Sequence, residues 1–395
     1  MEGDFIKLNK KLLPLSWLYG LGVKFRNMLF DMKILKSKSY VVPIISVGNI
    51  TVGGTGKTPH VEYLIQLLKD RFCVAMLSRG YKRKSHGYVL ATTETPMKMI
   101  GDEPYQIKQK YPNVTVAVDA KRTRGIEHLI HDDDTKKTDV ILLDDAFQHR
   151  YVKPGINILL VDYHRSIIFD KLIPTGRLRE PLKGKDRADI VIVTKCPKDL
   201  KPMEFRVLTK QMNLYPYQQL FFTTLDYGRM KKVFADQTKG SDFPENLEKL
   251  SDYHVLLLTG IASPKQIYYD VKPHAKDVKT LAYGDHHAFT QRDIHHINET
   301  YANMPSPKVI ITTEKDMVRL ETAEGLSNEV RSNLLVLPVR ISFMLEGETT
   351  FNENIIGYVQ KNSRNSILAK GKDGYQSEDS DSTGDRPRTI SFRNN

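Results

Sequence analysis

Short apolar runs alternate with longer amphipathic stretches through the first half of the chain. The runs at residues 72–77, 114–118, 140–143, 156–161 and 190–194 are apolar nearly throughout, and a β-branched run begins at residue 45. Strands that are apolar on both faces are typical of a parallel sheet that is covered by helices on each side. The alternation therefore predicts an α/β fold with a doubly wound, mostly parallel sheet.

A second, smaller α/β domain is expected after about residue 214. Extended runs at 220–225 and 334–341 bracket strand-like runs at 255–259 and 309–313, and we expect the two bracketing runs to pair as a linker. Residues 351–359 predict a final helix, and the Ser-, Asp-, Gly-, Lys- and Arg-rich chain after residue 361 predicts a disordered tail. The expected division is an N-terminal helix (1–37), a core domain (38–215), a smaller domain (216–345), a C-terminal helix (346–360) and the tail (361–395).

The N-terminal segment carries a helical apolar stripe. Leu18, Leu21, Phe25, Met28 and Met32 recur at the spacing of one helix face, and lysines and arginines surround them. A helix with this pattern is suited to lie in the lipid headgroup region of a membrane. The alternative is that the stripe packs against the protein's own domain.

Composition narrows the class of protein. The chain has 395 residues and a formal net charge of +12, which favours an anionic partner such as nucleic acid, a membrane surface or a phosphorylated substrate. Only Cys73 and Cys196 are present, so neither a disulfide framework nor a cysteine-based zinc site is supported. No run approaches the roughly 20 apolar residues of a membrane-spanning helix, so an integral membrane protein is not expected.

A glycine-rich turn that follows the first strand predicts a site for a nucleoside triphosphate. Its backbone N–H groups can face phosphate oxygens, the lysine can reach the β- and γ-phosphates, and the last threonine can bind Mg²⁺. Thr51 stands where the strict P-loop pattern has glycine, so the loop is a variant. The residues expected to bind the nucleotide are Gly53, Gly54, Thr55, Gly56, Lys57 and Thr58.

Acidic residues elsewhere fit a kinase that acts on an alcohol. Asp144 and Asp145 end an apolar strand, which is the usual place of carboxylates that orient Mg²⁺. Asp102 and Glu103 are candidates for the carboxylate near the attacking hydroxyl. For single residues such as Asp102 and Asp285, a loop or helix-capping role is the alternative.

Seven motifs in order resemble the tetraacyldisaccharide 4′-kinase family of lipid A biosynthesis. They are SVGNITVGGTGKTP at 46–59, LSRGYKR at 77–83, GDEP at 101–104, LDDAFQH at 143–149, LIPTGRLREP at 172–181, TGIA at 259–262 and DH at 285–286. The resemblance runs from the N-terminal helix to about residue 360. It implies ATP- and Mg²⁺-dependent phosphorylation of the 4′-hydroxyl of a tetraacylated glucosamine disaccharide 1-phosphate.

The resemblance also implies roles for individual residues. Asp102 matches the general base, and His286 matches a histidine that is paired with it. Thr58, Glu103, Asp144 and Asp145 match positions around the metal and nucleotide. For the substrate, the resemblance implies His149, one of Arg122 or Arg124, and the basic pair Arg177 and Arg179.

The family also implies a place and partners for the chain. The expected setting is peripheral, at the cytoplasmic face of the bacterial inner membrane, with an anionic glycolipid as substrate, no nucleic acid and a monomeric enzyme. Ala146 departs from the glycine expected after the acidic pair, which concerns the local backbone but not the carboxylates.

Two alternative functions stay open from the residues alone. A P-loop NTPase that acts on nucleic acid or as a switch would explain the charge, but the basic residues are scattered without interleaved aromatic residues. The VTKCP segment at 193–197 has proline where a GTPase base-reading motif has aspartate. A peripheral membrane protein that binds nucleotide without chemistry is the other alternative.

Overall fold

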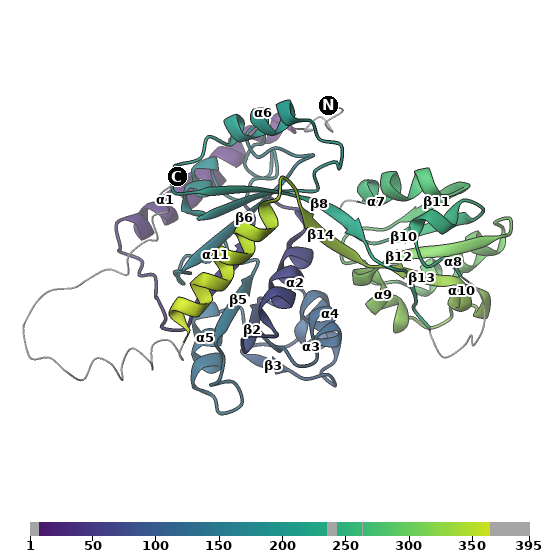
Figure 1. Ribbon diagram of the computed structural model, residues 1–395, viewed down its shortest axis with the longest axis horizontal. Coiled ribbons are helices and arrows are strands. Elements are labelled where there is room, and N and C mark those ends of the chain that lie inside the picture. The colour runs from purple at the N-terminus through teal and green to yellow at the C-terminus, as the bar shows by residue number, and fades with distance from the viewer. Residues whose placement is uncertain (1–7, 235–242, 263, 364–395) are drawn as a thin grey trace, which may run out of the picture.

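The computed structural model describes residues 8–234, 243–262 and 264–363. These residues form two sheets that lie side by side and are joined by a pair of strands (Figure 1). The larger sheet has nine strands in the order β14-β8-β7-β6-β1-β5-β2-β4-β3. Its strands are β1 (Ile44–Gly48), β2 (Val74–Ser78), β3 (Val89–Ala91), β4 (Thr115–Val118), β5 (Val140–Asp144), β6 (Ile156–Asp162), β7 (Ile190–Thr194), β8 (Gln219–Tyr227) and β14 (Val339–Phe343).

The larger sheet is parallel except for its two edge strands, β3 and β14. The predicted parallel strands are confirmed with small shifts at their ends, whereas the short edge strand β3 was not predicted. Alternate residues of the central strands point to opposite faces, where they pack into two separate apolar clusters. Both faces are therefore buried, as the doubly wound fold requires.

Helices cover both faces of this sheet. Residues of α2, α4 and α11 pack into the cluster on one face, and residues of α5 pack into the cluster on the other. The helices of this unit are α1 (Leu13–Asp31), α2 (Lys57–Leu68), α3 (Met97–Ile100), α4 (Asp102–Lys110), α5 (Arg122–His131), α6 (Pro202–Met212) and α11 (Gly347–Asn362), with 3₁₀ turns at Lys10–Leu12 and Leu182–Arg187.

The smaller sheet has the order β11-β10-β12-β13-β9. It is flanked by α7 on one face and by α8 and α10 on the other. The edge strand β11 was not predicted because most of its residues are exposed and its sequence lacks an apolar run. The elements are β9 (Lys231–Lys232), β10 (His254–Thr259), β11 (Asp277–Ala282), β12 (Lys308–Thr313), β13 (Leu334–Leu337), α7 (Pro264–Val271), α8 (Gln291–Ala302), α9 (Glu314–Glu321) and α10 (Asn328–Asn333), with 3₁₀ turns at Leu247–Leu250 and Lys272–His274.

The link between the two sheets is a two-stranded ribbon made by β8 and β14. The first half of β8 pairs with β7 in parallel, and its second half pairs with β14 in antiparallel register, with Phe343 opposite Thr223. The predicted pairing of 220–225 with 334–341 is thus found for the end of the second run only. Its first part, β13, belongs to the smaller sheet, where it pairs with β12.

Helix α1 exposes the apolar stripe that the sequence predicts. Trp17 is 76% exposed, Leu18 69% and Leu21 66%. The stripe itself therefore does not pack against the protein's own domain, although the helix does so through its opposite face. Polar contacts hold the opposite face, since Ser16 Oγ donates to the Leu172 carbonyl at 3.0 Å and Tyr19 donates to the Arg179 carbonyl at 2.6 Å.

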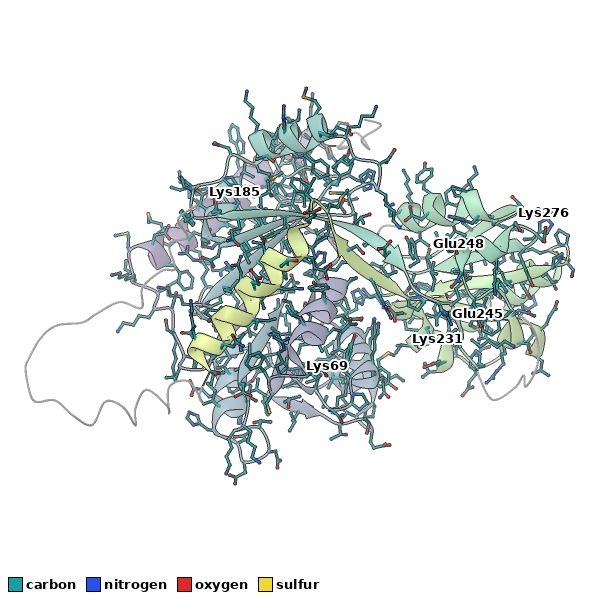
Figure 2. All side chains as sticks on the ribbon, viewed as in Figure 1. Lys69, Lys185, Lys231, Glu245, Glu248 and Lys276 are labelled. Carbon is teal, nitrogen blue, oxygen red and sulfur yellow. The ribbon has the colours of Figure 1, made fainter. Side chains whose placement is uncertain are left out.

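None of the helices among the described residues is long and apolar enough to cross a membrane. Charged side chains are distributed over both units: Figure 2 labels Lys69 and Lys185 on the larger unit and Lys231, Glu245, Glu248 and Lys276 on the smaller one. The predicted tail lies, except for its first residues, outside the described residues.

Candidate active site

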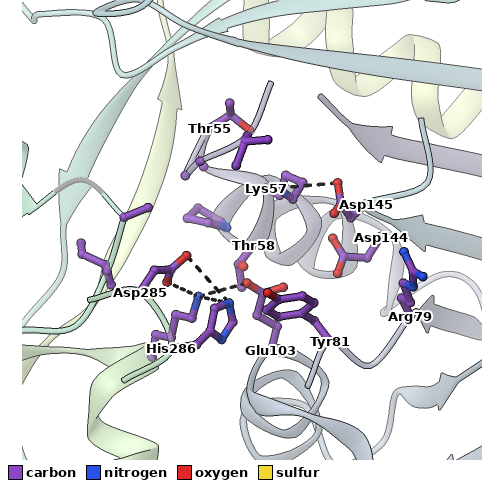
Figure 3. Close-up of a pocket in the computed structure, with 18 of the residues that line it drawn as sticks. Thr55, Lys57, Thr58, Arg79, Tyr81, Glu103, Asp144, Asp145, Asp285 and His286 are labelled. Atoms are coloured by element: carbon purple, nitrogen blue, oxygen red, sulfur yellow. Dashed lines mark hydrogen bonds and ion pairs between the residues drawn. The ribbon is translucent and has the colours of Figure 1, made fainter. Parts of the chain in front are cut away.

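A cavity of about 800 Å³ lies where the carboxyl ends of strands from both sheets meet. Figure 3 shows side chains from the glycine-rich loop, the acidic strand end and the smaller unit around it. Helix α1 contributes Tyr19, Val23, Arg26 and Asn27 to the wall. One cavity therefore joins the predicted nucleotide site, Glu103 and His286, and the N-terminal helix, whereas the predicted base Asp102 is not among its lining residues.

The glycine-rich loop uses the conformational freedom of two glycines. Gly53 has φ +119° and Gly56 has φ +81°, which side-chain-bearing residues rarely adopt, and α2 starts directly after Gly56. Thr51 instead forms a bridge with Leu178. The loop thus needs no glycine at position 51, because that residue belongs to the paired backbone before the turn.

Three successive carbonyls of the loop accept hydrogen bonds from side chains that lie outside the loop or in the following helix. Lys195 donates to the Gly54 carbonyl, Thr194 Oγ1 to the Thr55 carbonyl at 3.0 Å, and His60 Nδ1 to the Gly56 carbonyl at 2.7 Å. Since a carbonyl accepts, His60 carries its proton on Nδ1, and burial lowers the pKa of His60 to about 4. These donors fix the peptide planes and leave the loop N–H groups as the surface for an anion.

His60 also reaches the linker. Its Nε2 lies 3.1 Å from Thr223 Oγ1, at the point where β8 changes partner from β7 to β14. The conformation of the loop is therefore connected to the ribbon that joins the two units.

The acidic strand end lies beside the loop lysine. Asp145, with φ +47°, lies 3.6 Å from Lys57 Nζ and accepts hydrogen bonds from Arg179 at 3.1 Å. Burial alone would raise the pKa of Asp145, but Lys57 and Arg179 outweigh it and the pKa is lowered. The left-handed residue at this turn is Asp145, so Ala146 needs no special backbone freedom.

Asp144 has a different environment. It is buried, Ser78 Oγ donates to its Oδ2 at 3.2 Å, and its Oδ1 has no hydrogen-bond partner in the described part of the chain. Burial, followed by the charges of Glu103 and Asp145, raises the pKa of Asp144. A bound cation would relieve this repulsion, so the carboxylates fit a magnesium ion.

The protein side chains do not form a complete metal cage. Among the described residues, no group of three or more His, Cys, Asp or Glu side chains is arranged to hold a metal ion. Mg²⁺ in phosphoryl-transfer sites takes many of its oxygen ligands from substrate phosphates and water. Four residues line the same cavity and would supply only some of the ligands of such an ion: Thr58, Glu103, Asp144 and Asp145.

Asp102 and His286 are brought together from the two units. His286 Nδ1 lies 2.9 Å from Asp102 Oδ2, although the residues are 184 positions apart. Arg319 donates to the same oxygen through Nε at 3.1 Å and through Nη2. Burial raises the pKa of Asp102, but the hydrogen bonds from His286 and Arg319 outweigh it and hold the pKa at about 2. The carboxylate is therefore ionised in the neutral range.

Two residues of this cluster were missed in the sequence. Arg319 and Lys315 both lie on α9, and Lys315 Nζ is 3.0 Å from Asp285 and 3.1 Å from His286 Nε2. The available signal was their position directly after the predicted strand at 309–313, at the carboxyl edge of a parallel sheet. Their partners gave no local signal, because they lie elsewhere in the chain. Asp102, for example, lies more than 200 residues before them.

The predicted substrate-binding residues are only partly brought to the cavity. Arg179 lines it, whereas Arg122, Arg124, His149 and Arg177 are not among its lining residues. Arg122 is 2% exposed and donates to the carbonyls of Asp119 and Asp144 at 2.8 and 3.0 Å. It supports the acidic strand end from beneath.

The other basic candidates have local partners. Arg124 forms a two-point pair with Asp119 at 2.7 and 2.8 Å. Burial and the nearby Arg122 charge lower the pKa of His149 to about 4. Arg177 is exposed, and its carbonyl accepts from the N–H of Val52 at 2.7 Å.

The chain matches one family of known proteins over most of its length. The family model described as tetraacyldisaccharide-1-P 4′-kinase (LpxK) matches residues 8–360. The tetraacyldisaccharide 4′-kinase of Phocaeicola vulgatus is 55% identical over 368 residues, which cover 93% of this chain and 99% of that protein. The enzyme of the same name from Bacteroides thetaiotaomicron is 50% identical over 381 residues, covering 95% and 100%.

A solved structure leads to the same assignment. The crystal structure of LpxK from Aquifex aeolicus in complex with ATP matches with a TM-score of 0.66 and 29% identity, covering 88% of this chain and 98% of that one. The resemblance expected from the seven motifs and the P-loop α/β fold are both confirmed. The chain belongs to the tetraacyldisaccharide-1-P 4′-kinase family.

Proposed function

We propose that this chain transfers the γ-phosphate of ATP to the 4′-hydroxyl of a tetraacylated glucosamine disaccharide 1-phosphate. The single observation that carries this proposal is that the phosphate loop lines one cavity together with Glu103 and His286, and that Asp102 is hydrogen-bonded to this histidine. A nucleotide switch needs no carboxylate opposite the phosphate loop, whereas a kinase that acts on an alcohol uses one near the attacking oxygen.

Asp102 is the proposed general base. As the sugar 4′-oxygen bonds to the γ-phosphorus, its proton passes to the Asp102 carboxylate, the bond from the γ-phosphorus to the bridging oxygen breaks, and ADP leaves. His286 and Arg319 both bind Oδ2, so Oδ1 is the oxygen that faces the hydroxyl. The Lys57 ammonium and the N–H groups of residues 53–58 hold the phosphates in line.

A magnesium ion fits beside the nucleotide. When bound, it would neutralise charge on the β- and γ-phosphates. Thr58, Glu103, Asp144 and Asp145 are the proposed protein contacts, and the unpartnered Oδ1 of Asp144 is the structural reason to include that residue. Arg179, which already balances Asp145, adds positive charge at the same wall.

Helix α1 is proposed to place the enzyme on the cytoplasmic face of the inner membrane. Its apolar stripe faces outward while Tyr19 and Arg26 line the cavity, so lipid and catalytic groups lie on opposite sides of one helix. The net charge of +12 favours anionic headgroups and the substrate 1-phosphate. The proposed active unit is a monomer.

We propose no direct substrate contact for four basic residues, because they do not line the cavity. These are His149, Arg122, Arg124 and Arg177. We retain Arg179 as the basic residue nearest the transferred phosphate. For Arg122 the proposed role is to support Asp144 through its backbone.

Transfer of labelled γ-phosphate from ATP to a tetraacyl disaccharide 1-phosphate in detergent tests the proposal. The wild type should transfer phosphate and Asp102→Ala should lose at least roughly 100-fold in kcat. Asp133→Ala is the matched control, since the Asp133 side chain is 92% exposed on the surface. A folded wild type that binds ATP but transfers nothing would overturn the proposal, and strong ATP hydrolysis without lipid would favour a nucleic-acid or switch NTPase.

A further inference from the structure

Lys315 makes three contacts that the proposed reaction leaves without a role. It lies in the first turn of α9, and its Nζ is 3.0 Å from Asp285 Oδ1, 3.1 Å from His286 Nε2 and 3.3 Å from Glu103 Oε1. Its side chain is only 18% exposed. Figure 3 labels the three partners of this half-buried cation, which are Glu103, Asp285 and His286.

The contact with His286 determines where the imidazole proton lies. A lysine ammonium has three donors and no acceptor, so the ring nitrogen that faces it must accept. The Nε2 of His286 therefore carries a lone pair and the proton of the neutral ring is on Nδ1. From Nδ1 it donates to Asp102 Oδ2 at 2.9 Å.

We propose that Lys315 is a positioning residue that keeps a proton of His286 on Nδ1 and so aims it at Asp102. The inference rests on the proposed function in taking Asp102 as the base. Without Lys315 the imidazole could flip its tautomer, present a lone pair to the carboxylate and lose the hydrogen bond.

The charges around His286 support this assignment. Asp102 and the Arg319 guanidinium face Nδ1, with Arg319 Nη2 3.3 Å from that nitrogen. Because both Arg319 Nη2 and Nδ1–H are donors, they converge on Asp102 rather than bind each other. The ring of Tyr81 lies against the imidazole at a centroid distance of 5.0 Å.

On the Nε2 side, two opposite charges compete. The Lys315 ammonium at 3.1 Å opposes a second proton on the ring, whereas the Asp285 carboxylate at 3.9 Å favours one. Glu103 lies beyond, as the third partner of the ammonium. Lys315 is closer than Asp285 and binds its carboxylate, so Nε2 faces a hydrogen-bond donor on this side.

The contact with Glu103 ties this arrangement to the meeting of the two units. Glu103 is in α4 of the larger unit, while Asp285, His286 and Lys315 belong to the smaller one. One of the three contacts of the ammonium is thus made only when the two units meet.

Nitrogen NMR of the full-length protein with ¹⁵N-labelled histidine tests the proposal. The His286 signals, assigned with His286→Gln, should show protonated Nδ1 and unprotonated Nε2 in the wild type at pH 7. Lys315→Met should give the other tautomer or the doubly protonated ring, because the donor that faces Nε2 is then absent. Lys315→Arg, which restores a donor, should return the wild-type pattern at least in part.

Lys110→Met is the matched control for the loss of a lysine that joins the two units. Lys110 also joins the two units, through Glu62 and Glu314, but does not contact His286. It should leave the tautomer unchanged. In the kinase assay, Lys315→Met should lower kcat roughly 10-fold or more with little change in KM for ATP.

The outcomes separate the two proposals. An Nε2-protonated ring in the wild type, or an unchanged Nδ1-protonated ring in Lys315→Met, would overturn the role of Lys315. A wild type with the expected tautomer but no phosphate transfer would instead overturn the proposed function, because the NMR result does not depend on activity.

Discussion

At the scale of single residues, the cavity collects backbone conformations that are otherwise uncommon. Lys82, Asp145, Lys195 and His286 have φ between +47° and +57°, and all four line the cavity. A left-handed non-glycine residue costs about 1 kcal/mol or more and persists where its surroundings hold it. Here the surroundings are side-chain contacts, such as the pair that Lys195 makes with Asp162 at 2.6 Å.

Lys195→Met should weaken the binding of ATP. The variant loses the donor to the Gly54 carbonyl and leaves Asp162 without its cation, so the loop can turn a carbonyl toward the phosphates. A charged hydrogen bond is worth about 1.5–3 kcal/mol, which predicts a KM for ATP roughly 10-fold higher with a smaller change in kcat. Steady-state kinetics with varied ATP measure this.

Lys198→Met is the matched control for this prediction. It lies three residues further along, its side chain is 68% exposed, and it pairs with Asp226 away from the loop. Equal KM values for Lys195→Met, Lys198→Met and the wild type would contradict a role of Lys195 in holding the loop.

At the scale of elements, α1 reverses the usual orientation of an amphipathic helix. Its large apolar side chains face outward, and its serine, tyrosine and arginine bind backbone groups of the larger unit. An exposed apolar patch of this kind marks an interaction surface. The cavity lies on the other side of the helix, where Tyr19 and Arg26 line it.

A double substitution of Leu18 and Leu21 to Glu should reduce binding to vesicles that contain anionic lipid. Each leucine that enters the headgroup region contributes about 1.5–3 kcal/mol, so the affinity should fall at least roughly 10-fold. Vesicle co-sedimentation measures the affinity, and ATP binding in solution should stay unchanged. Met203→Glu, which places the same charge at a 67% exposed methionine on α6, is the control. If both variants sediment with the vesicles as the wild type does, the stripe does not bind the lipid surface.

At the scale of the whole molecule, the two units meet through few charged contacts beyond the β8–β14 ribbon. Lys110 Nζ lies 2.6 Å from Glu62 of the larger unit and 2.7 Å from Glu314 of the smaller one. Glu62 is 4% exposed. Burial and the charge of Glu314 raise the pKa of Glu62 to about 7 despite the nearby lysine.

Lys110→Met should destabilise the protein in a pH-dependent way. Because the pKa is raised, the folded state favours protonated Glu62. The unfavourable contribution of ionised Glu62 to folding stability is therefore absent below about pH 4.5 and grows as the pH rises through about 7. Without the lysine, ionised Glu62 is left buried, which predicts a loss of about 2 kcal/mol or more at pH 8 and a smaller loss at pH 5.5.

Urea denaturation at the two pH values measures this loss. Adding Glu62→Gln to Lys110→Met should recover most of the stability at pH 8, and Lys69→Met, at a partly exposed lysine paired with Asp70, is the control. A loss of equal size at both pH values would contradict the assignment to Glu62.

Much of the site could be predicted because its signals are local. The turn that ends in Lys57 and Thr58, the acids at the end of β5 and the apolar stripe of α1 each lie within about twenty consecutive residues. Backbone freedom, strand burial and helix periodicity act over such distances, so the order of residues suffices. The same signals failed for β11, where an exposed edge strand carries no apolar run.

The sequence by itself determined the types of most elements, the phosphate loop and the family, because these depend on local periodicity and turn chemistry. Only the tertiary structure decided which groups reach Asp102. Arg319 lies 217 residues away and joins Asp102 because the smaller unit meets the larger one across the β8–β14 ribbon. The tertiary structure likewise turned Arg122 inward and the stripe of α1 outward, since burial depends on how elements pack and not on the pattern within any one of them.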